Sequence, residues 1–310
     1  MLKDLLGYLV VRLGWMVLTL WAVFTVSFLL MHSVPGSPFS SERSVPPAIE
    51  RQLMQKHNLD APLHEQYLAD IRRIVTKGDL GWSTKLEDYS VNEVIAEGFP
   101  VSASLAIFAL VFALMLGISS GVISAVYRGT VADSSMMIAA VLGIAIPNFV
   151  LASLAILVFV FWIQVFPAAG FGSLKQMVLP SLCLGAPLAA YIARLCRAGM
   201  LETLTKEHVR TAFAKGLPKR AVIIKHVLPG ALLPVVSFLG PAVARVLTGS
   251  LVLEKIFALP GIGSHFVEAA LQRDYTLAMG MVLTYTVLLF TMNSIVDVIY
   301  AVIDPRVELH

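Results

Sequence analysis

The sequence predicts an all-α membrane protein with six transmembrane helices. Of its 310 residues 57% are apolar and only 14% are charged, whereas soluble domains average about 45–50% apolar and about 25% charged residues. The mean hydropathy is +0.81, and six stretches are long enough to cross a hydrocarbon core of about 30 Å. A soluble protein of this composition would expose large apolar patches, so the soluble enzyme classes are excluded.

The six predicted spans carry few or no charges. The first has nineteen uncharged residues, which is too long for the apolar region of a signal peptide, and no small-residue cleavage site follows it. The third is about 32 residues long, so we expect a kink at Pro147, or a short helix before it, to absorb the excess. The predicted spans cover residues 13–31, 101–126, 134–165, 177–193, 232–253 and 277–302.

The distribution of lysine and arginine predicts that both termini lie in the cytoplasm, because cytoplasmic loops carry an excess of these residues. With that orientation the short outer loops, 166–176 and 254–276, hold three of them. Segment 32–100 holds seven, but long segments are translocated largely regardless of charge. Twelve lie in the predicted cytoplasmic segments 1–12, 127–133, 194–231 and 303–310.

The chain is predicted to have four parts. Residues 1–31 form the cytoplasmic N-terminus and first span, and 32–100 form a small outer segment. Residues 101–302 form a five-span core that contains the cytoplasmic loop 194–231, and 303–310 form the cytoplasmic C-terminus. The outer segment is the polar part of the chain, since it holds 17 charged side chains in 69 residues.

The outer segment shows three helical signals. Pro46 and Pro47 open a predicted helix. A second helix is predicted because apolar residues recur at helical spacing at Leu63, Tyr67, Ile71 and Ile74. The third signal, the capping-box spacing of Ser90 and Glu93, precedes a short amphipathic turn that Pro100 is expected to end. The segment is either a docking surface or lid at the outer mouth, or a folded loop that braces the spans.

The loop 194–231 carries eight basic residues and predicts two short helices. The first should end near Lys215, because Gly216 suits the position after a helix end and Pro218 follows. The second should cover 219–227 and stop at Leu228-Pro229-Gly230. A helix that ends in small residues suits a groove on another protein; the alternative is a surface loop with the usual cytoplasmic charge.

This loop resembles the "EAA" loop of membrane subunits of ABC importers, whose pattern is E-A-A-x3-G-x9-I-x-L-P. The glycine and the Leu-Pro pair fall in register. Arg210-Thr211 replaces Glu-Ala and His226 replaces Ile, which is the usual form in the peptide-importing branch. The matching stretches are Arg210-Thr211-Ala212-Phe213-Ala214-Lys215-Gly216 and His226-Val227-Leu228-Pro229.

Further stretches extend the resemblance over nearly the whole chain, to the first of two permease subunits of an oligopeptide or dipeptide ABC importer. The outer stretch Asp88-Tyr89-Ser90-Val91-Asn92 is most similar to the oligopeptide type. The others are Val34-Pro35-Gly36-Ser37-Pro38, Leu259-Pro260-Gly261-Ile262-Gly263, Arg273-Asp274-Tyr275, and Val296-Asp297 through Ile303-Asp304-Pro305-Arg306.

The resemblance implies a type I ABC importer permease fold with a small helical periplasmic insertion between the first two spans. It implies a multi-pass protein of the bacterial inner membrane, surrounded by lipid. Its partners would be a second homologous permease subunit, two ABC ATPase subunits, an extracytoplasmic peptide-binding protein and the peptide substrate, with no role for nucleic acid. ATP and Mg²⁺ would bind to the ATPases and no cofactor to this chain. The sequence has no G-x-x-x-x-G-K-[ST] motif, so the chain is not expected to be an enzyme by itself.

The same resemblance implies that the first loop helix lies in a cleft of an ATPase subunit. ATP-driven closure of the ATPases would then move this helix and switch the pathway between its inward-facing and outward-facing states. The expected coupling residues are Val209, Arg210, Thr211, Ala212, Phe213, Ala214, Lys215, Gly216, Leu217, Leu228 and Pro229.

Two charged residues lie inside predicted spans, where charges are functional candidates. At about 1.5 Å per residue, Arg245 and Asp297 differ in depth by roughly 12 Å, which argues against a direct pair. Asp297 matches a recurring family feature and is expected to be structural. Arg245 either faces the path and meets a peptide carboxylate, or makes a polar contact with the partner subunit or backbone.

A small-residue pattern inside the second span also matches a catalytic motif. Gly117-Ile118-Ser119-Ser120-Gly121 has the G-x-S-x-G spacing of a nucleophile elbow, but such an elbow needs a strand–turn–helix setting. Gly117 and Gly121 are therefore expected to form a packing face. The seven histidines and two cysteines show no metal-binding spacing, and Cys183 and Cys196 are expected to be ordinary helix thiols.

Three alternatives differ in function. The same architecture could import nickel, glutathione or another small solute. A stand-alone secondary transporter is a remote alternative, because we find no internal repeat and only Arg245 lies deep in a span. An intramembrane hydrolase is also remote, since no histidine within the spans could serve Ser119.

Overall fold

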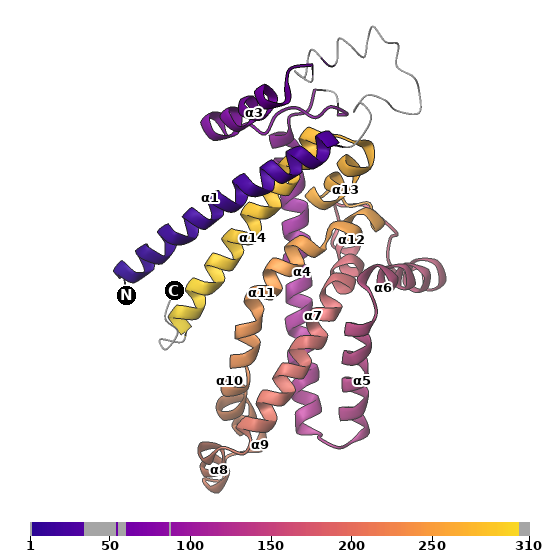
Figure 1. Ribbon diagram of the computed structural model, residues 1–310. Coiled ribbons are helices and arrows are strands. Elements are labelled where there is room, and N and C mark those ends of the chain that lie inside the picture. Colours follow the sequence, from indigo (N-terminus) through magenta and orange to yellow (C-terminus); the bar gives the residue numbers. More distant parts are fainter. Residues whose placement is uncertain (1, 34–53, 55–59, 87, 304–310) are drawn as a thin grey trace. The chain divides into compact units, whose positions relative to one another are not determined.

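The computed structural model describes residues 2–33, 54, 60–86 and 88–303. In these residues the chain is helical apart from turns and one isolated bridge between Trp82 and Ser90 (Figure 1). It divides into two compact units, which we describe separately. The first comprises the chain up to Val101 together with Pro260–Ser294, and the second comprises Ser102–Leu259 with the end of the last helix.

The first unit contains α1 (Leu2–Ser33), α3 (Leu63–Lys77), α13 (Ile262–Gln272) and the first parts of α4 (Val91–Val126) and α14 (Tyr275–Ile303). The helix predicted from the spacing of Leu63, Tyr67, Ile71 and Ile74 is α3. The last three of these pack against a cluster formed by Phe24 and Phe28 of α1 and Met279 and Leu283 of α14. The predicted helix at Pro46 and Pro47 lies outside the described residues.

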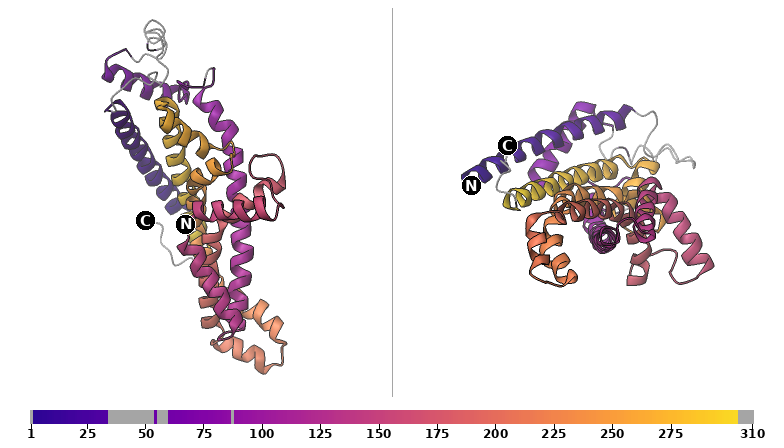
Figure 2. Two further views of the ribbon diagram at one scale, coloured as in Figure 1. Left: turned by 90° about the vertical axis from the view of Figure 1, so that its right-hand side faces the viewer. Right: turned by 90° about the horizontal axis from the view of Figure 1, so that it is seen from below.

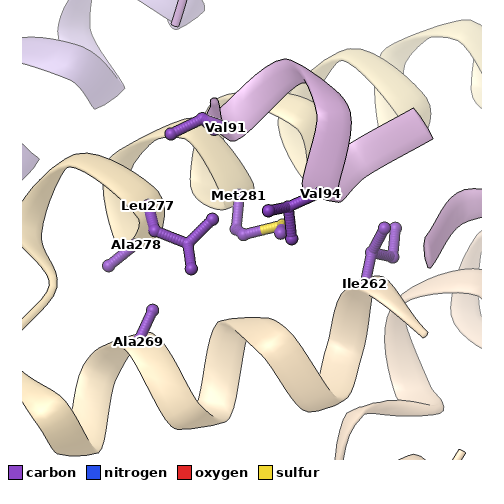
Figure 3. Packing of buried hydrophobic residues seen from close by; sticks show 7 residues of the cluster. All are labelled: Val91, Val94, Ile262, Ala269, Leu277, Ala278 and Met281. Atoms are coloured by element: carbon purple, nitrogen blue, oxygen red, sulfur yellow. The ribbon is translucent and has the colours of Figure 1, made fainter. Parts of the chain in front are cut away.

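A second apolar cluster joins three helices of the same unit. Figure 3 shows Val94 of α4, Ile262 and Ala269 of α13, and Leu277 and Met281 of α14 turned toward one another. Full burial of such a side chain stabilises a fold by about 1.5–3 kcal/mol. The cluster therefore fixes the beginning of α4 against α13 and α14.

The beginning of α4 confirms one prediction and corrects another. Ser90 and Glu93 form the predicted capping box, in which the Ser90 amide donates to Glu93 Oε2 (2.9 Å) and the Glu93 amide to Ser90 Oγ (3.2 Å). Pro100, however, does not end a short turn, because α4 continues through it to Val126. Proline costs a helix interior about 3 kcal/mol, and burial of Val94 and Val101 on either side of it offsets that cost.

The second unit is organised around α7 (Leu174–Thr203). Packed against it are α5 (Val131–Ala145), α6 (Asn148–Ala155), α10 (Leu228–Ala231) and α11 (Leu233–Gly249). The unit also contains α4 from Ser102 onward and the end of α14. Its remaining elements are η1 (Ile156–Trp162), α8 (Glu207–Ala214), α9 (Lys219–Val222), η2 (Ile223–Val227) and α12 (Leu251–Ile256).

In the described residues four helices are long and apolar enough to cross a membrane, and two bent pairs bring the total to six if each pair is one span. The chain turns by 110° between α5 and α6–η1, a sharper change than the kink expected at Pro147. Ile146 is extended (ψ 124°) because it precedes a proline. The fourth predicted span continues to Thr203, and the fifth corresponds mainly to α11, preceded by a bend of 45°.

Helices α4 and α7 approach closely at glycines. A Cβ atom on Gly117 would lie 2.7 Å from the Ala189 carbonyl oxygen, and one on Gly121 would lie 2.7 Å from that of Ala193. From the opposite side, a Cβ on Gly185 would lie 2.5 Å from the Ala109 oxygen. This is the geometry of small-residue helix packing, and Ser119 donates to the Met115 carbonyl within the helix.

We expect Gly121→Ala to lower the stability of the chain by about 1–3 kcal/mol, because the added methyl group has no room against α7. Gly143→Ala is the matched control, since its Cβ would lie 3.4 Å from the nearest atom, in ordinary contact with Ala190. The measurement is the unfolding temperature of each variant in detergent. Equal temperatures for the two variants would show that the α4–α7 contact is not tightly packed.

Candidate functional site: the loop after α7

The loop after α7 begins with α8, which ends where the sequence predicts. Gly216 has a left-handed backbone (φ +75°). Its amide donates to the Phe213 carbonyl (2.9 Å), and the Leu217 amide donates to the Ala212 carbonyl (3.4 Å). These two bonds define a Schellman motif, which satisfies the last carbonyls of the helix. Figures 1 and 2 show α8 and α9 together at one end of this unit, beyond the end of α7.

The predicted coupling residues divide into a buried and an exposed set. Val209 and Ala212 are buried, at 0% and 3% exposure. Leu228 is half-buried. The exposed residues are Arg210, Thr211, Phe213, Ala214, Lys215, Gly216, Leu217 and Pro229.

The buried side chains, Val209 and Ala212, pack α8 against the rest of the loop. α8 packs against α9 and η2, where Val222 and Val227 are fully buried. His208 Nε2 donates to the His226 carbonyl oxygen (3.2 Å). The exposed face of α8 is thus presented by a helix whose opposite face is held by packing.

The second half of the loop differs from the prediction. The chain does not stop at Leu228-Pro229-Gly230 but stays helical from Lys219 to Ala231. The Leu228 amide bonds to the Ile223 carbonyl five residues earlier, which makes η2 a π-turn. Pro229 lacks an N–H and would clash in a regular α-helix, and a π-turn accommodates it.

The exposed face combines apolar and basic groups. Phe213 and Leu217 are 44% and 39% exposed, and Arg210 and Lys215 lie beside them in the sequence. Arg210 reaches Glu207 at 3.8 Å, but such an exposed pair contributes little to stability. An aromatic anchor with arginine near it is the composition of a protein-binding surface.

The other predicted residues lie away from this surface in the sequence. Arg245 is an exposed residue of α11, and Asp297 is a half-buried residue of α14. The two cysteines are buried free thiols of α7. Across the described residues, no group of three or more histidine, cysteine or acidic side chains could hold a metal ion.

Two buried aspartates were missed by the sequence analysis as candidate residues. Asp133 of α5 pairs with Arg197 of α7, with both guanidinium–carboxylate distances 2.8 Å. Asp274, before α14, accepts from the backbone and side chain of the connection between α3 and α4. The sequence offers one signal for each: Asp133 lies beside an apolar span, and Asp274 lies in the stretch Arg273-Asp274-Tyr275. The partners of the two aspartates are 64 and about 190 residues away.

The comparisons with known proteins match most of the chain to membrane components of transport systems. The family model "Binding-protein-dependent transport system inner membrane component" matches residues 113–309. The dipeptide transport system permease protein of Bacillus subtilis (strain 168) is 45% identical over 98% of both chains. The oligopeptide transport system permease protein of Escherichia coli (strain K12) is 43% identical, covering 94% of this chain and 95% of the relative.

A solved structure supports the fold. An amino acid ABC transporter crystallised with histidines has a chain that superposes with a TM-score of 0.53 at 13% identity. The superposition covers 67% of this chain and 93% of the other. Because the family model spans well over half of the sequence and the relatives align along nearly all of it, this chain belongs to the binding-protein-dependent transport system inner membrane components.

Proposed function

We propose that this chain is the transmembrane subunit of an ATP-driven importer, and that it forms the pathway for oligopeptides or dipeptides delivered by an external binding protein. The observation that carries the proposal is the alignment with a dipeptide and an oligopeptide permease at 45% and 43% identity over 98% and 94% of the chain. An alignment of that extent includes the outer segment, the spans and the loop after α7.

The proposed complex contains four membrane-associated subunits. A second homologous permease completes the pathway, and two ABC ATPase subunits bind ATP and Mg²⁺. The chain lies in the bacterial inner membrane with both termini in the cytoplasm, as the lysine and arginine distribution favours. Segment 32–100 then faces the binding protein, and 194–231 faces the ATPases.

In this proposal the exposed face of α8 is the coupling surface. Phe213 and Leu217 would enter a cleft of an ATPase subunit, with Arg210 and Lys215 at its rim. Since Val209 and Ala212 are buried beneath, α8 would move as a rigid body when the ATPases close. The movement would pass along α7 and α10, which join the loop to the spans.

Arg245 is proposed as a path residue that meets the peptide carboxylate. Its side chain is exposed on α11 while its neighbour Val246 is buried, and an intramembrane arginine is functional by default. An Arg245→Met variant should then lose import of free peptides more than import of C-amidated peptides. An equal loss for both would remove the carboxylate contact from the proposal.

The function is tested by reconstituting the chain in liposomes with a homologous permease, two ABC ATPase subunits and a peptide-binding protein. Labelled dipeptides, oligopeptides, nickel and glutathione are offered with the binding protein outside and ATP inside. We expect ATP-dependent uptake of peptides only. Uptake of nickel or glutathione without peptide uptake would keep the architecture and change the cargo, and uptake without ATPase subunits would overturn the proposal.

A further inference from the structure

One buried carboxylate connects three helices close to the loop after α7. Asp133, in the first turn of α5, is 6% exposed. Its Oδ1 accepts a hydrogen bond from Arg197 Nε and its Oδ2 accepts one from Arg197 Nη2 of α7, each at 2.8 Å. It also accepts from Ser124 Oγ of α4 and from the Gly129 amide (3.0 Å) in the turn between α4 and α5. Each of the two carboxylate oxygens therefore accepts two hydrogen bonds.

The geometry of this ion pair is directional. A guanidinium that donates two parallel bonds to one carboxylate fixes orientation as well as distance. Other contacts between α4, α5 and α7 are close approaches at glycine, such as Gly117 to the Ala189 carbonyl and Gly143 to Ala190. A glycine contact allows close approach but makes no directional bond, whereas the bidentate pair fixes the orientation of its two helices.

Arg197 lies at the end of α7 that carries the loop. On another side of this end, a Cβ on Gly199 would lie 2.5 Å from the Ala231 carbonyl oxygen of α10. Only three residues separate α7 from α8, and they are held by the bonds from the amides of Leu204, Thr205 and Lys206 to carbonyls of α7. Because this connection is short and hydrogen-bonded, a displacement of α8 also displaces the end of α7.

We propose that Arg197 and Asp133 are positioning residues that transmit the movement of the α8 loop from α7 to α4 and α5. The inference rests on the proposed function, in which the ATPases move α8. Neither residue touches substrate or nucleotide in this scheme. Their contribution is to make the turn between α4 and α5 move together with α7 in each transport cycle.

The test separates transmission from folding by removing both charges together. Replacing a buried ion pair by apolar residues of similar volume is often neutral or stabilising, whereas removing one partner strands a buried charge. We therefore use the double variant Asp133→Leu with Arg197→Met, and Arg197→Lys as a variant that keeps the charge and loses the bidentate geometry. The control is Arg128→Met, which removes an exposed arginine from the turn between α4 and α5.

The readouts are ATPase association, unfolding temperature and peptides imported per ATP hydrolysed in liposomes. We expect the double variant to keep its ATPases but to unfold at a lower temperature, because Ser124 and the Gly129 amide lose their acceptor. It should import at least tenfold fewer peptides per ATP, a ratio that counts only assembled complexes. Arg197→Lys should lose about threefold, and the control should match the wild type. A double variant that keeps its ATPases and the wild-type ratio, or an equal fall in the control, would overturn the inference. If the wild-type chain itself binds no ATPase, the proposed function fails instead.

Discussion

Replacing Phe213 by aspartate is expected to release the ATPase subunits from the complex. Phe213 is the large apolar side chain on the exposed face of α8, at 44% exposure. Truncating an aromatic anchor at an interface costs about 2–4 kcal/mol, and a carboxylate left in the same place adds a desolvation cost. Affinity should fall by roughly 30-fold to 1,000-fold, since each 1.4 kcal/mol is a factor of ten.

The measurement is the amount of ATPase that co-purifies with the tagged chain after extraction in mild detergent. Val131→Asp is the matched control, because Val131 is 85% exposed at the start of α5 and outside the loop. An aspartate in the first turn of a helix is favourable there. Wild-type amounts of ATPase on the Phe213→Asp variant would contradict the assignment of α8 as the coupling surface, and loss from both variants would point to a non-specific effect.

The features that were predictable from sequence are those set by local physics. An apolar stretch of about 20 residues has few alternatives to a membrane helix, so the spans were found. The end of α8 was also predictable, because Gly216 can adopt a left-handed backbone and Pro218 cannot continue the helix. The capping box at Ser90 and Glu93 depends on only three residues of spacing.

The errors occur where packing overrides a local rule. Pro100 and Pro229 both carry a signal to end a helix, yet the chain stays helical at each. At Pro100 the flanking valines are buried, and at Pro229 a π-turn precedes the proline. The bend at Pro147 had the right position but not the right size, because a local rule does not fix how the next helix packs on α7.

The long-range polar contacts could not be predicted at all from this sequence. Asp133 is separated from Arg197 by 64 residues, and no spacing rule relates α5 to α7, which meet only in the folded chain. The role in transmission that we propose for Asp133 and Arg197 therefore depends on the arrangement of α4, α5 and α7 in space.

A second large effect is expected for Asp274→Ala. This side chain is 1% exposed and precedes α14. Its carboxylate accepts from Ser83 Oγ and from the backbone amides of Thr84 (3.2 Å), Lys85 (3.3 Å) and Leu277 (3.1 Å). Alanine would leave several donors unsatisfied, which costs about 1–3 kcal/mol for each buried group.

Hydrogen exchange of the Thr84 and Lys85 amides measures this loss. At about 2 kcal/mol of local destabilisation their protection should fall roughly 30-fold. Glu268→Ala, which removes an exposed carboxylate of α13, is the control and should leave these amides unchanged.

Asp274→Asn separates the two roles of this carboxylate. Asparagine with its oxygen at the Oδ1 position still accepts from Leu277 at the start of α14 and from Thr84, but it offers no acceptor to the Lys85 amide at the Oδ2 position. The Lys85 amide also donates to Ser83 Oγ (3.1 Å), but Ser83 is itself held by Oδ2, so loss of this oxygen loosens both acceptors of the amide. Protection should therefore fall more at Lys85 than at Leu277 in this variant. If Asp274 served only as a helix cap, the asparagine variant would behave like the wild type at both amides, because asparagine is as good a cap as aspartate. A selective loss at Lys85 would instead show that this aspartate also holds the connection between α3 and α4 against the start of α14.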